Sequence, residues 1–163
     1  MPLPYVIEGI PHNEEALIRE IVYQAIFVAD GETAPTREIL ERPALQKYHT
    51  HWGRPGDIGL MAVEKRTERA IGGAFVRLYP AENAGYGFVA EDYPELNISV
   101  WPGYRGHGIG TQLLEKLIVE LKKRGFPGLS LSVDARNPAL TLYLRQGFKV
   151  VKEEGNPSML LRF

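Results

Sequence analysis

The feature that most constrains the fold is a cluster of glycines between an alternating segment and an amphipathic one. Four glycines lie within eight positions: Gly103, Gly106, Gly108 and Gly110. Before them, residues 95–101 alternate apolar and polar side chains, which is the period of a β-strand. After them, apolar residues recur at helical spacing over 111–125. Because glycine costs backbone entropy on folding, such a cluster requires a reason, and it predicts a tight strand-to-helix loop.

The rest of the chain is read as further strands and helices. Apolar runs or alternation predict strands at 5–8, 56–65, 70–80, 129–135, 148–154 and 159–163. Helical spacing and capping residues predict helices that begin at an Asn13 cap and extend to Phe27, that cover 36–49 with a break before Pro43, and that cover 137–147. This order predicts an α/β fold in which helices flank a mixed central sheet. Since no long linker divides the chain, residues 1–163 are expected to form one domain.

Composition excludes several classes of function. The 19 Lys and Arg residues and 20 Asp and Glu residues give a formal net charge of −1, so the basic surplus typical of nucleic-acid binders is missing. The chain has no cysteine, which excludes disulfides, thiolate zinc sites and a cysteine nucleophile. His49 and His51 have no evident third ligand, so no metal is expected. No membrane segment and no signal peptide are found in the sequence, and the expected location is the cytoplasm.

A glycine-rich turn that enters a helix exposes main-chain N–H groups beside the positive end of the helix dipole, which is a phosphate-binding geometry. An ATPase P-loop requires Lys followed by Ser or Thr after the last glycine, whereas Gln112 follows Thr111 here. A dinucleotide fingerprint would require glycine at position 111. A tight turn without any ligand would explain one or two of the glycines, and it stays open as the alternative.

Four motifs in order resemble one family. "RGHGIG" at 105–110 fits the pattern R/Q-x-x-G-x-G/A, and "VWP" at 100–102 precedes it. "NPA" at 137–139 and "LYLRQGF" at 142–148 follow. Together they resemble the GCN5-related N-acetyltransferase (GNAT) family, strongly from about Glu95 to Val150 and only in topology over the first ninety residues. The resemblance implies an acetyl-CoA-binding core at about 95–150 and a splayed pair of parallel strands at the CoA site.

The resemblance also implies which residues hold acetyl-CoA, the co-substrate. The strand edge Ile98, Ser99 and Val100 would contact the acetyl carbonyl and the pantetheine amides. Asn137 would cap its helix and bind the pantetheine arm. The loop assigned to the pyrophosphate consists of Arg105, Gly106, His107, Gly108, Ile109, Gly110 and Thr111.

Two residues are candidates for proton transfer. Tyr143 matches the general acid of the family, which would hydrogen-bond the CoA sulfur and protonate the departing thiolate. Glu95 matches a position at which some members carry a glutamate base. The alternatives are a packed aromatic ring for Tyr143 and a solvated strand-end carboxylate for Glu95. Members that acetylate ribosomal protein N-termini carry a glutamate where Ser132 stands here, and this departure counts against a close match to them.

The leading hypothesis from the sequence is an enzyme, an N-acetyltransferase that moves acetyl from acetyl-CoA to a primary amine of a small molecule by direct attack. One alternative is a protein acetyltransferase that acts on a terminal amine or a lysine. An alternative of another class is a non-catalytic acyl-CoA-binding module. The partners expected are acetyl-CoA, an amine acceptor and a second copy of the chain in a homodimer.

Overall fold

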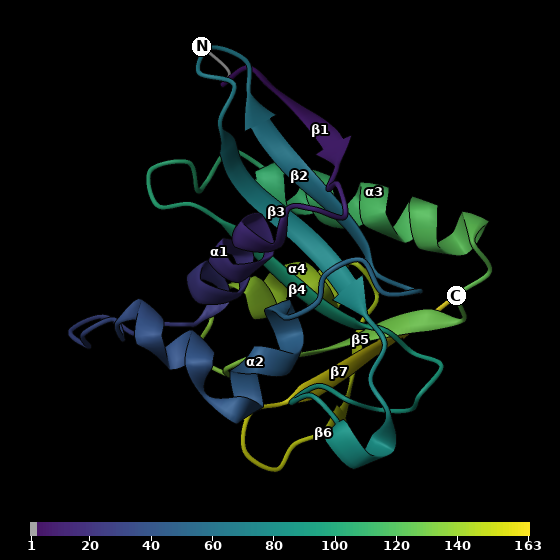
Figure 1. The fold of residues 1–163 in the computed structure, drawn as a ribbon. Coiled ribbons are helices and arrows are strands. Elements are labelled where there is room, and N and C mark those ends of the chain that lie inside the picture. Colours follow the sequence, from purple (N-terminus) through teal and green to yellow (C-terminus); the bar gives the residue numbers. More distant parts are fainter. Residues whose placement is uncertain (1–2) are drawn as a thin grey trace.

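The computed structural model describes residues 3–163, which form a seven-stranded sheet covered by helices (Figure 1). The strand order is β1-β2-β3-β4-β5-β7-β6, and β4 and β5 are the parallel pair while the other neighbours are antiparallel. The strands are β1 (Tyr5–Gly9), β2 (Ile58–Glu64), β3 (Ala70–Arg77), β4 (Glu95–Val100), β5 (Gly128–Ser132), β6 (Lys149–Lys152) and β7 (Ser158–Arg162). The predicted mixed sheet flanked by helices is therefore confirmed.

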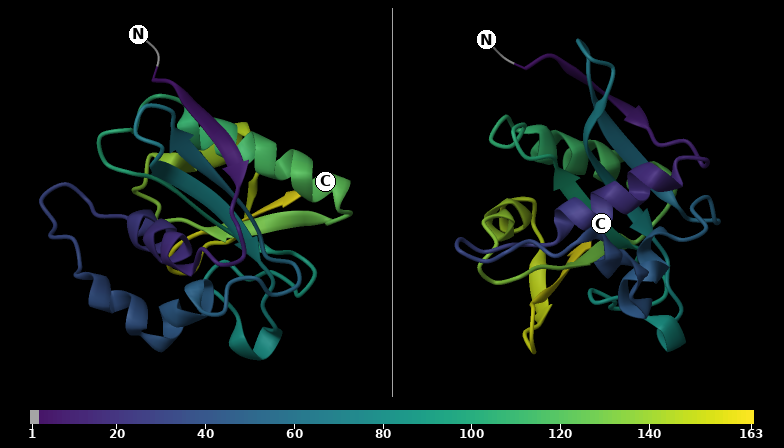
Figure 2. Two further views of the ribbon diagram at one scale, coloured as in Figure 1. Left: turned by 45° about the horizontal axis from the view of Figure 1, so that its top comes forward. Right: turned by 60° about the vertical axis from the view of Figure 1, so that its left-hand side comes forward.

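Helices cover both faces of the sheet. The α-helices are α1 (Glu15–Ala25), α2 (Pro43–His49), α3 (Ile109–Lys123) and α4 (Ala139–Arg145), and short 3₁₀ turns are η1 (Arg37–Glu41) and η2 (Ala81–Asn83). Figure 2 shows α1 and α3 on opposite sides of the central strands. We call these sides the α1/α2 face and the α3/α4 face. None of the helices within residues 3–163 has the length and apolarity needed to cross a membrane.

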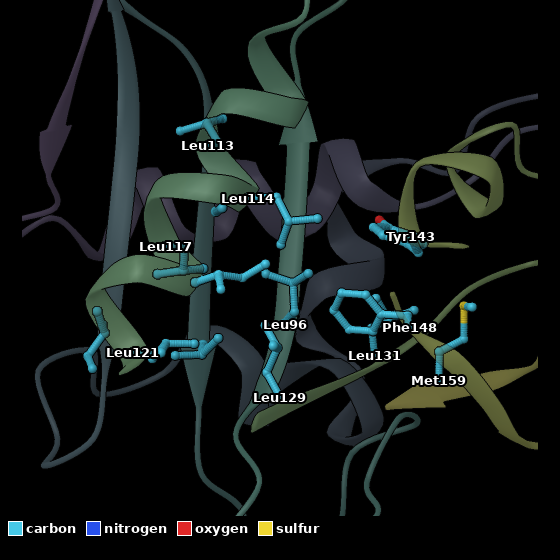
Figure 3. Close-up of a cluster of buried hydrophobic side chains, with 14 of the residues drawn as sticks. Leu96, Leu113, Leu114, Leu117, Leu121, Leu129, Leu131, Tyr143, Phe148 and Met159 are labelled. Carbon is cyan, nitrogen blue, oxygen red and sulfur yellow. The ribbon is translucent and has the colours of Figure 1, made fainter. Parts of the chain in front are cut away.

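The larger hydrophobic core lies on the α3/α4 face. The helical spacing of apolar residues in α3 places one face of the helix against the central strands, where these residues are almost fully buried (Figure 3). Burial of one such leucine contributes about 2 kcal/mol. The residues of α3 in this core are Ile109, Leu113, Leu114, Leu117, Ile118 and Leu121.

The ends of α3 are set by glycines in the left-handed region. Gly108 precedes the helix with φ of 77°, and Gly125 follows it with φ of 81°. After Gly125, the N–H of Phe126 donates to Leu121 O at 3.1 Å, which closes the helix as a glycine-terminated end does. The predicted helix end at Gly125 is thus confirmed.

The first helix differs from its prediction. It begins at Glu15 and ends at Ala25, and no side chain caps its N-terminus, so the predicted Asn13 cap is wrong. A turn in which Glu14 N–H donates to Pro11 O precedes the helix instead. Ile26 is extended, so it and Phe27 lie beyond the helix. The expectation of one domain over 1–163 stays a prediction, and its first two residues lie outside the described part of the chain.

Candidate active site

The two parallel strands β4 and β5 separate soon after they meet. Glu95 pairs with Ser130, and Ser130 N–H donates to Pro94 O at 2.9 Å. Within the described residues this is the one register pair between the two strands. Toward their carboxyl ends the strands diverge, and the predicted splayed pair is confirmed. We call the opening the fork.

The alternation of β4 decides which main-chain groups face the fork. Trp101 N–H donates to Ile71 O on the β3 side at 2.8 Å. Since every second residue of an antiparallel strand turns its N–H and C=O to the same neighbour, Ser99 also turns these groups toward β3. Ile98 and Val100 turn theirs toward β5, where the strands have separated. Of the three residues predicted to form the strand edge, Ile98 and Val100 therefore turn main-chain groups toward a ligand in the fork, and Ser99 does not.

The glycine loop lies between the end of β4 and the start of α3. Gly103, Gly106 and Gly108 have φ of 92°, 82° and 77°, a conformation that favours glycine. A Cβ at any of these three positions would meet no atom within 4 Å, so the space beside the loop is open. The turn conformation therefore accounts for three of the four glycines, and the open space beside them leaves room for a ligand.

The first turn of α3 has main-chain donors without a cap. Gly108 O accepts the N–H of Gln112, and within residues 3–163 no side chain bonds the N–H groups of Ile109, Gly110 and Thr111. Together with the helix dipole, these groups suit a phosphate. Gly106 and His107 are exposed beside them.

Arg105 and Asn137 have local partners in the structure. Arg105 Nε donates to Val100 O at 2.8 Å, so its side chain folds back over the end of β4. Asn137 Oδ1 accepts the N–H of Ala139 at 2.9 Å, which confirms its predicted role at the start of α4. Their contacts with a ligand stay predictions.

Tyr143 is held in the core of the α3/α4 face. It is 7% exposed, and its ring packs edge-on against Phe148 with centroids 5.8 Å apart. Its hydroxyl points toward β4 (Figure 3). Burial raises the pKa of Tyr143 to about 12. The phenol therefore carries its proton at neutral pH, as a general acid must.

Glu95 is buried on the other face of the sheet. It is 3% exposed, so the alternative of a solvated strand-end carboxylate is wrong. Its Oε2 accepts a hydrogen bond from the Tyr48 hydroxyl at 2.7 Å. The N–H of Gly87 faces the carboxylate, but Oε1 has no partner with hydrogen-bond geometry in the described part of the chain. Burial raises the pKa of Glu95 to about 7, against the opposing effects of the Tyr48 hydrogen bond and the Lys47 charge.

The two candidate catalytic residues approach the fork from opposite faces. Ser99 Oγ donates to Ile21 O of α1, which places the odd-numbered side chains of β4, Glu95 among them, on the α1/α2 face. Leu96 lies in the same core as Tyr143, on the α3/α4 face. Glu95 and Tyr143 therefore lie on opposite faces of the sheet, and Glu95 lies at the closed end of the fork, where β4 still pairs with β5.

Sequence reasoning missed the residues that surround Glu95. Tyr48 on α2 binds its carboxylate, and Gly85 passes so close that a Cβ there would overlap Glu95 Oε1. A Cβ at Gly87 would overlap the main chain of Leu131 and Ser132, so this loop lies directly on β5. Glycine at these two positions is the sequence signal of this close approach.

The loop over 83–94 contributes an exposed tyrosine beside Tyr48. Tyr86 is 64% exposed and stacks on Tyr48 with centroids 6.5 Å apart. Beside it a cavity of about 90 Å³ is lined by Lys47 and Gly85, together with Ala44 and Ala84. Gly85 therefore separates this cavity from the buried Glu95 carboxylate.

Comparison with known proteins agrees with this geometry. Residues 23–148 match the model of the acetyltransferase (GNAT) family. The chain is 41% identical over 63 residues to [ribosomal protein bS18]-alanine N-acetyltransferase of Haemophilus influenzae, and 46% identical over 61 residues to that of Escherichia coli K12. These matches cover 39% and 37% of this chain. They cover 43% and 41% of the relatives, so the chain spans less than half the length of the curated relatives it matches.

Solved structures share the fold at low sequence identity. A GNAT acetyltransferase from Brucella melitensis in complex with acetyl-CoA has a TM-score of 0.60 and 22% identity, and the match covers 99% of this chain and 89% of that one. PaiA N-acetyltransferase from Thermoplasma acidophilum in complex with coenzyme A has a TM-score of 0.67 and 18% identity, and the match covers 98% of this chain and 99% of that one. Ribosomal-protein-alanine N-acetyltransferase from Brucella melitensis has a TM-score of 0.66 and 22% identity, and the match covers 97% of this chain and 99% of that one. The family match over most of the chain, together with the fork and the glycine loop, shows that this protein belongs to the GNAT acetyltransferase family.

Proposed function

We propose that this protein is an N-acetyltransferase that uses acetyl-CoA, and that its acceptor is the α-amino group of a protein N-terminus. The observation that carries the reaction is the fork, with Tyr143 and Glu95 on its two sides. The acceptor rests on the relatives, whose names give an alanine of ribosomal protein bS18 as the residue that is N-acetylated. The comparisons thus favour the protein acceptor over the small-molecule amine that the sequence predicted first.

Acetyl-CoA fits the donors around the fork. The N–H groups of Ile109, Gly110 and Thr111 and the open space beside the glycines suit its pyrophosphate. The main-chain groups of Ile98 and Val100 suit the amides and the acetyl carbonyl of the acyl arm. An N–H directed at that carbonyl would stabilise the negative charge that develops on its oxygen.

The proton transfers follow from the two pKa values. The acceptor amine arrives as an ammonium, and Glu95, ionised above a pKa of about 7, takes one proton from it directly or through a water. The amine nitrogen forms a bond to the acetyl carbon, and the bond between this carbon and sulfur breaks. Tyr143 gives its proton to the departing thiolate, and the nitrogen, which is positively charged after the attack, releases its second proton to the resulting tyrosinate directly or through a water. The products are an N-acetyl amine and free CoA.

The cavity beside Gly85 supports an acceptor that approaches Glu95 from the α1/α2 face, with Gly85 between the two. The cavity lined by Lys47, Gly85 and Tyr86 lies on the solvent side of the carboxylate. A main-chain terminus is narrow, and the exposed Tyr86 ring could pack on the residues that follow it. The non-catalytic module of the sequence analysis requires neither a buried carboxylate nor a buried phenol at the fork.

A panel of acceptors tests the proposal. A peptide that begins with alanine is compared with the same peptide blocked at its N-terminus and carrying an internal lysine, and with small primary amines and polyamines. CoA release gives the rate, and mass spectrometry locates the acetyl group. We expect acetylation of the free α-amine. Transfer to small amines alone would overturn the acceptor, and acetyl-CoA binding without transfer to any amine would leave only the binding module.

The homodimer and the cytoplasmic location expected from the sequence stay predictions. Light scattering with size-exclusion chromatography at several protein concentrations would decide the oligomeric state. Fluorescence microscopy of a tagged chain in its own cells would decide the location.

A further inference from the structure

The hydroxyl of Tyr48 joins two parts of the α1/α2 face that the proposed mechanism does not otherwise connect. It donates to Glu95 Oε2 at 2.7 Å and accepts the N–H of Tyr86 at 2.7 Å. Tyr48 is 3% exposed, as Glu95 is. Both hydrogen-bonding roles of the phenol are used, so its rotation and its position are fixed from two sides.

The helix that carries Tyr48 is itself held by a buried arginine. Arg77 is 0% exposed, and its Nη1 donates to Lys47 O at 3.0 Å and to Thr50 O at 2.6 Å. Its Nη2 donates to His51 O at 3.1 Å. Its Nε and Nη2 form a bidentate pair with Asp57 at 2.9 and 2.8 Å. All the donors of the guanidinium are thereby used, and the C-terminal end of α2 is anchored to β3.

We propose that Tyr48 is a positioning residue for Glu95, which selects Oε1 as the oxygen that accepts the proton of the amine. The inference rests on the proposed function, in which Glu95 is the base. Oε2 is occupied by the Tyr48 hydroxyl, whereas Oε1 has no partner within residues 3–163 and lies against Gly85, which lines the cavity beside it. The two carboxylate oxygens therefore differ: Oε2 is held by the Tyr48 hydroxyl, and Oε1, the oxygen beside Gly85, is left for the proton.

Tyr48 keeps its proton and donates its hydrogen bond to Glu95 over the pH range in which Glu95 titrates. The titratable groups that face the carboxylate are Tyr48 and Lys47 from α2 and Tyr79 after β3. Arg77 pairs with Glu95 in the strand register, but its charge is bound to Asp57. Burial and the neighbouring Glu95 hold the pKa of Tyr48 far above its usual range, so it keeps its proton.

Removal of the Tyr48 hydroxyl should therefore move the titration of Glu95 upward. A hydrogen bond to the ionised carboxylate lowers its pKa, and its loss would raise the pKa by about one unit. Tyr48→Phe keeps the ring and removes the donor. Tyr79→Phe is the matched control, because this tyrosine lies edge-on to Tyr48 with centroids 5.4 Å apart and its hydroxyl has no partner in the described residues.

Two measurements read the effect. The acid limb of kcat/KM against pH is recorded with a good acceptor, and the carboxyl carbon of Glu95 is titrated by ¹³C NMR, with Glu95→Gln to assign the signal. We expect both curves to move up by about one pH unit in Tyr48→Phe and to stay in place in Tyr79→Phe. The KM for acetyl-CoA should not change, because Tyr48 lies on the face opposite the α3/α4 core.

The outcomes separate this inference from the proposed function. If Glu95 titrates in Tyr48→Phe as it does in the wild type, the positioning role is wrong, even where Glu95→Gln abolishes transfer. An equal shift in Tyr79→Phe would also overturn it, because the effect would then belong to any buried hydroxyl of this cluster. If the wild type acetylates no amine at all, the proposed function is wrong, and the NMR titration still decides whether Tyr48 holds the carboxylate.

Discussion

The two faces of the sheet meet at the fork, but they are built differently. On the α3/α4 face, the glycine loop, the first turn of α3 and Tyr143 come from one stretch of chain, residues 103–143, and they rest on a hydrophobic core. On the α1/α2 face, Glu95 is bound by Tyr48, which lies 47 residues away in the sequence. Buried polar groups, Arg77 and Asp57 among them, hold this second side together.

The difference shows what each ligand demands of the protein. A pyrophosphate can be held by main-chain N–H groups, which glycine and a helix start supply whatever the side chains are. A proton must be taken by one side-chain oxygen with a suitable pKa, which requires burial and several distant partners. The first site is therefore local and the second is not. Variants of the glycine loop should therefore change acetyl-CoA affinity, whereas variants of the two proton-transfer residues should change the rate of acetyl transfer.

The largest effect is expected on the α3/α4 face from Tyr143→Phe. The change removes one hydroxyl and keeps the ring that packs against Phe148, so the fold should be retained. Loss of a general acid should lower kcat by about 10²-fold or more. Acetyl-CoA affinity should change little, because the bond to sulfur matters in the transition state. A normal rate of acetyl transfer in single-turnover experiments would exclude Tyr143 as the acid.

A smaller loss is expected on the α1/α2 face from Glu95→Gln. At pH 8 the wild-type carboxylate is ionised, because its pKa is about 7, and the variant should lose about 10- to 100-fold in kcat/KM. As the pH falls below 7, the wild type becomes protonated and loses the same function, so the difference should shrink. A pH–rate profile for the variant parallel to that of the wild type would remove Glu95 from the mechanism.

Gly108→Val tests whether the loop acts through its main chain. The side chain would enter the open space beside the first turn of α3, and acetyl-CoA affinity measured by calorimetry should fall about tenfold. The left-handed φ of 77° also makes any side chain costly, by about 1–2 kcal/mol of stability.

Gly125→Val supplies the matched control at the other end of the same helix. Gly125 has φ of 81° and equally open surroundings, so its variant carries the same backbone strain. We expect it to lose similar stability and no affinity. Equal losses of affinity in both variants would mean that the loop acts through stability alone, and the pyrophosphate assignment would then be wrong.

Sequence reasoning predicted the α3/α4 side well because its signals are local. The alternation of 95–101, the glycines and the leucine spacing of α3 each depend on neighbours within a few residues. The first helix was predicted less well. Asn13 is a residue type that often caps helices, but the chain forms a turn over Pro11–Glu14 and the helix begins after it. That choice depends on tertiary packing, which local preferences do not include.

The α1/α2 side could be predicted only in part, because its polar residues are of types that are usually exposed to solvent. Tyr48, His49 and Arg77 are polar, yet the structure buries all three. Their burial depends on partners from different elements, such as Asp57 for Arg77, and single residues carry no sign of such pairing. Glu95 was identified through a family resemblance, and its environment was not.

The smallest effect is expected from Ser99→Ala, at the point where the two faces share one strand. The resemblance grouped Ser99 with Ile98 and Val100, but its main chain turns toward β3 and its hydroxyl donates to Ile21 O at 2.8 Å. Loss of this hydrogen bond should cost about 1 kcal/mol of stability, or roughly 2–4 °C in Tm. Because the groups that face the fork are unchanged, kcat and acetyl-CoA affinity should stay within about twofold of the wild type. Thermal unfolding measures the change in Tm, and steady-state kinetics measure kcat and the response to acetyl-CoA. A loss of affinity beyond tenfold without a change in Tm would show that the Ser99 side chain reaches the ligand, and the exclusion of Ser99 from the groups that face the fork would then be wrong.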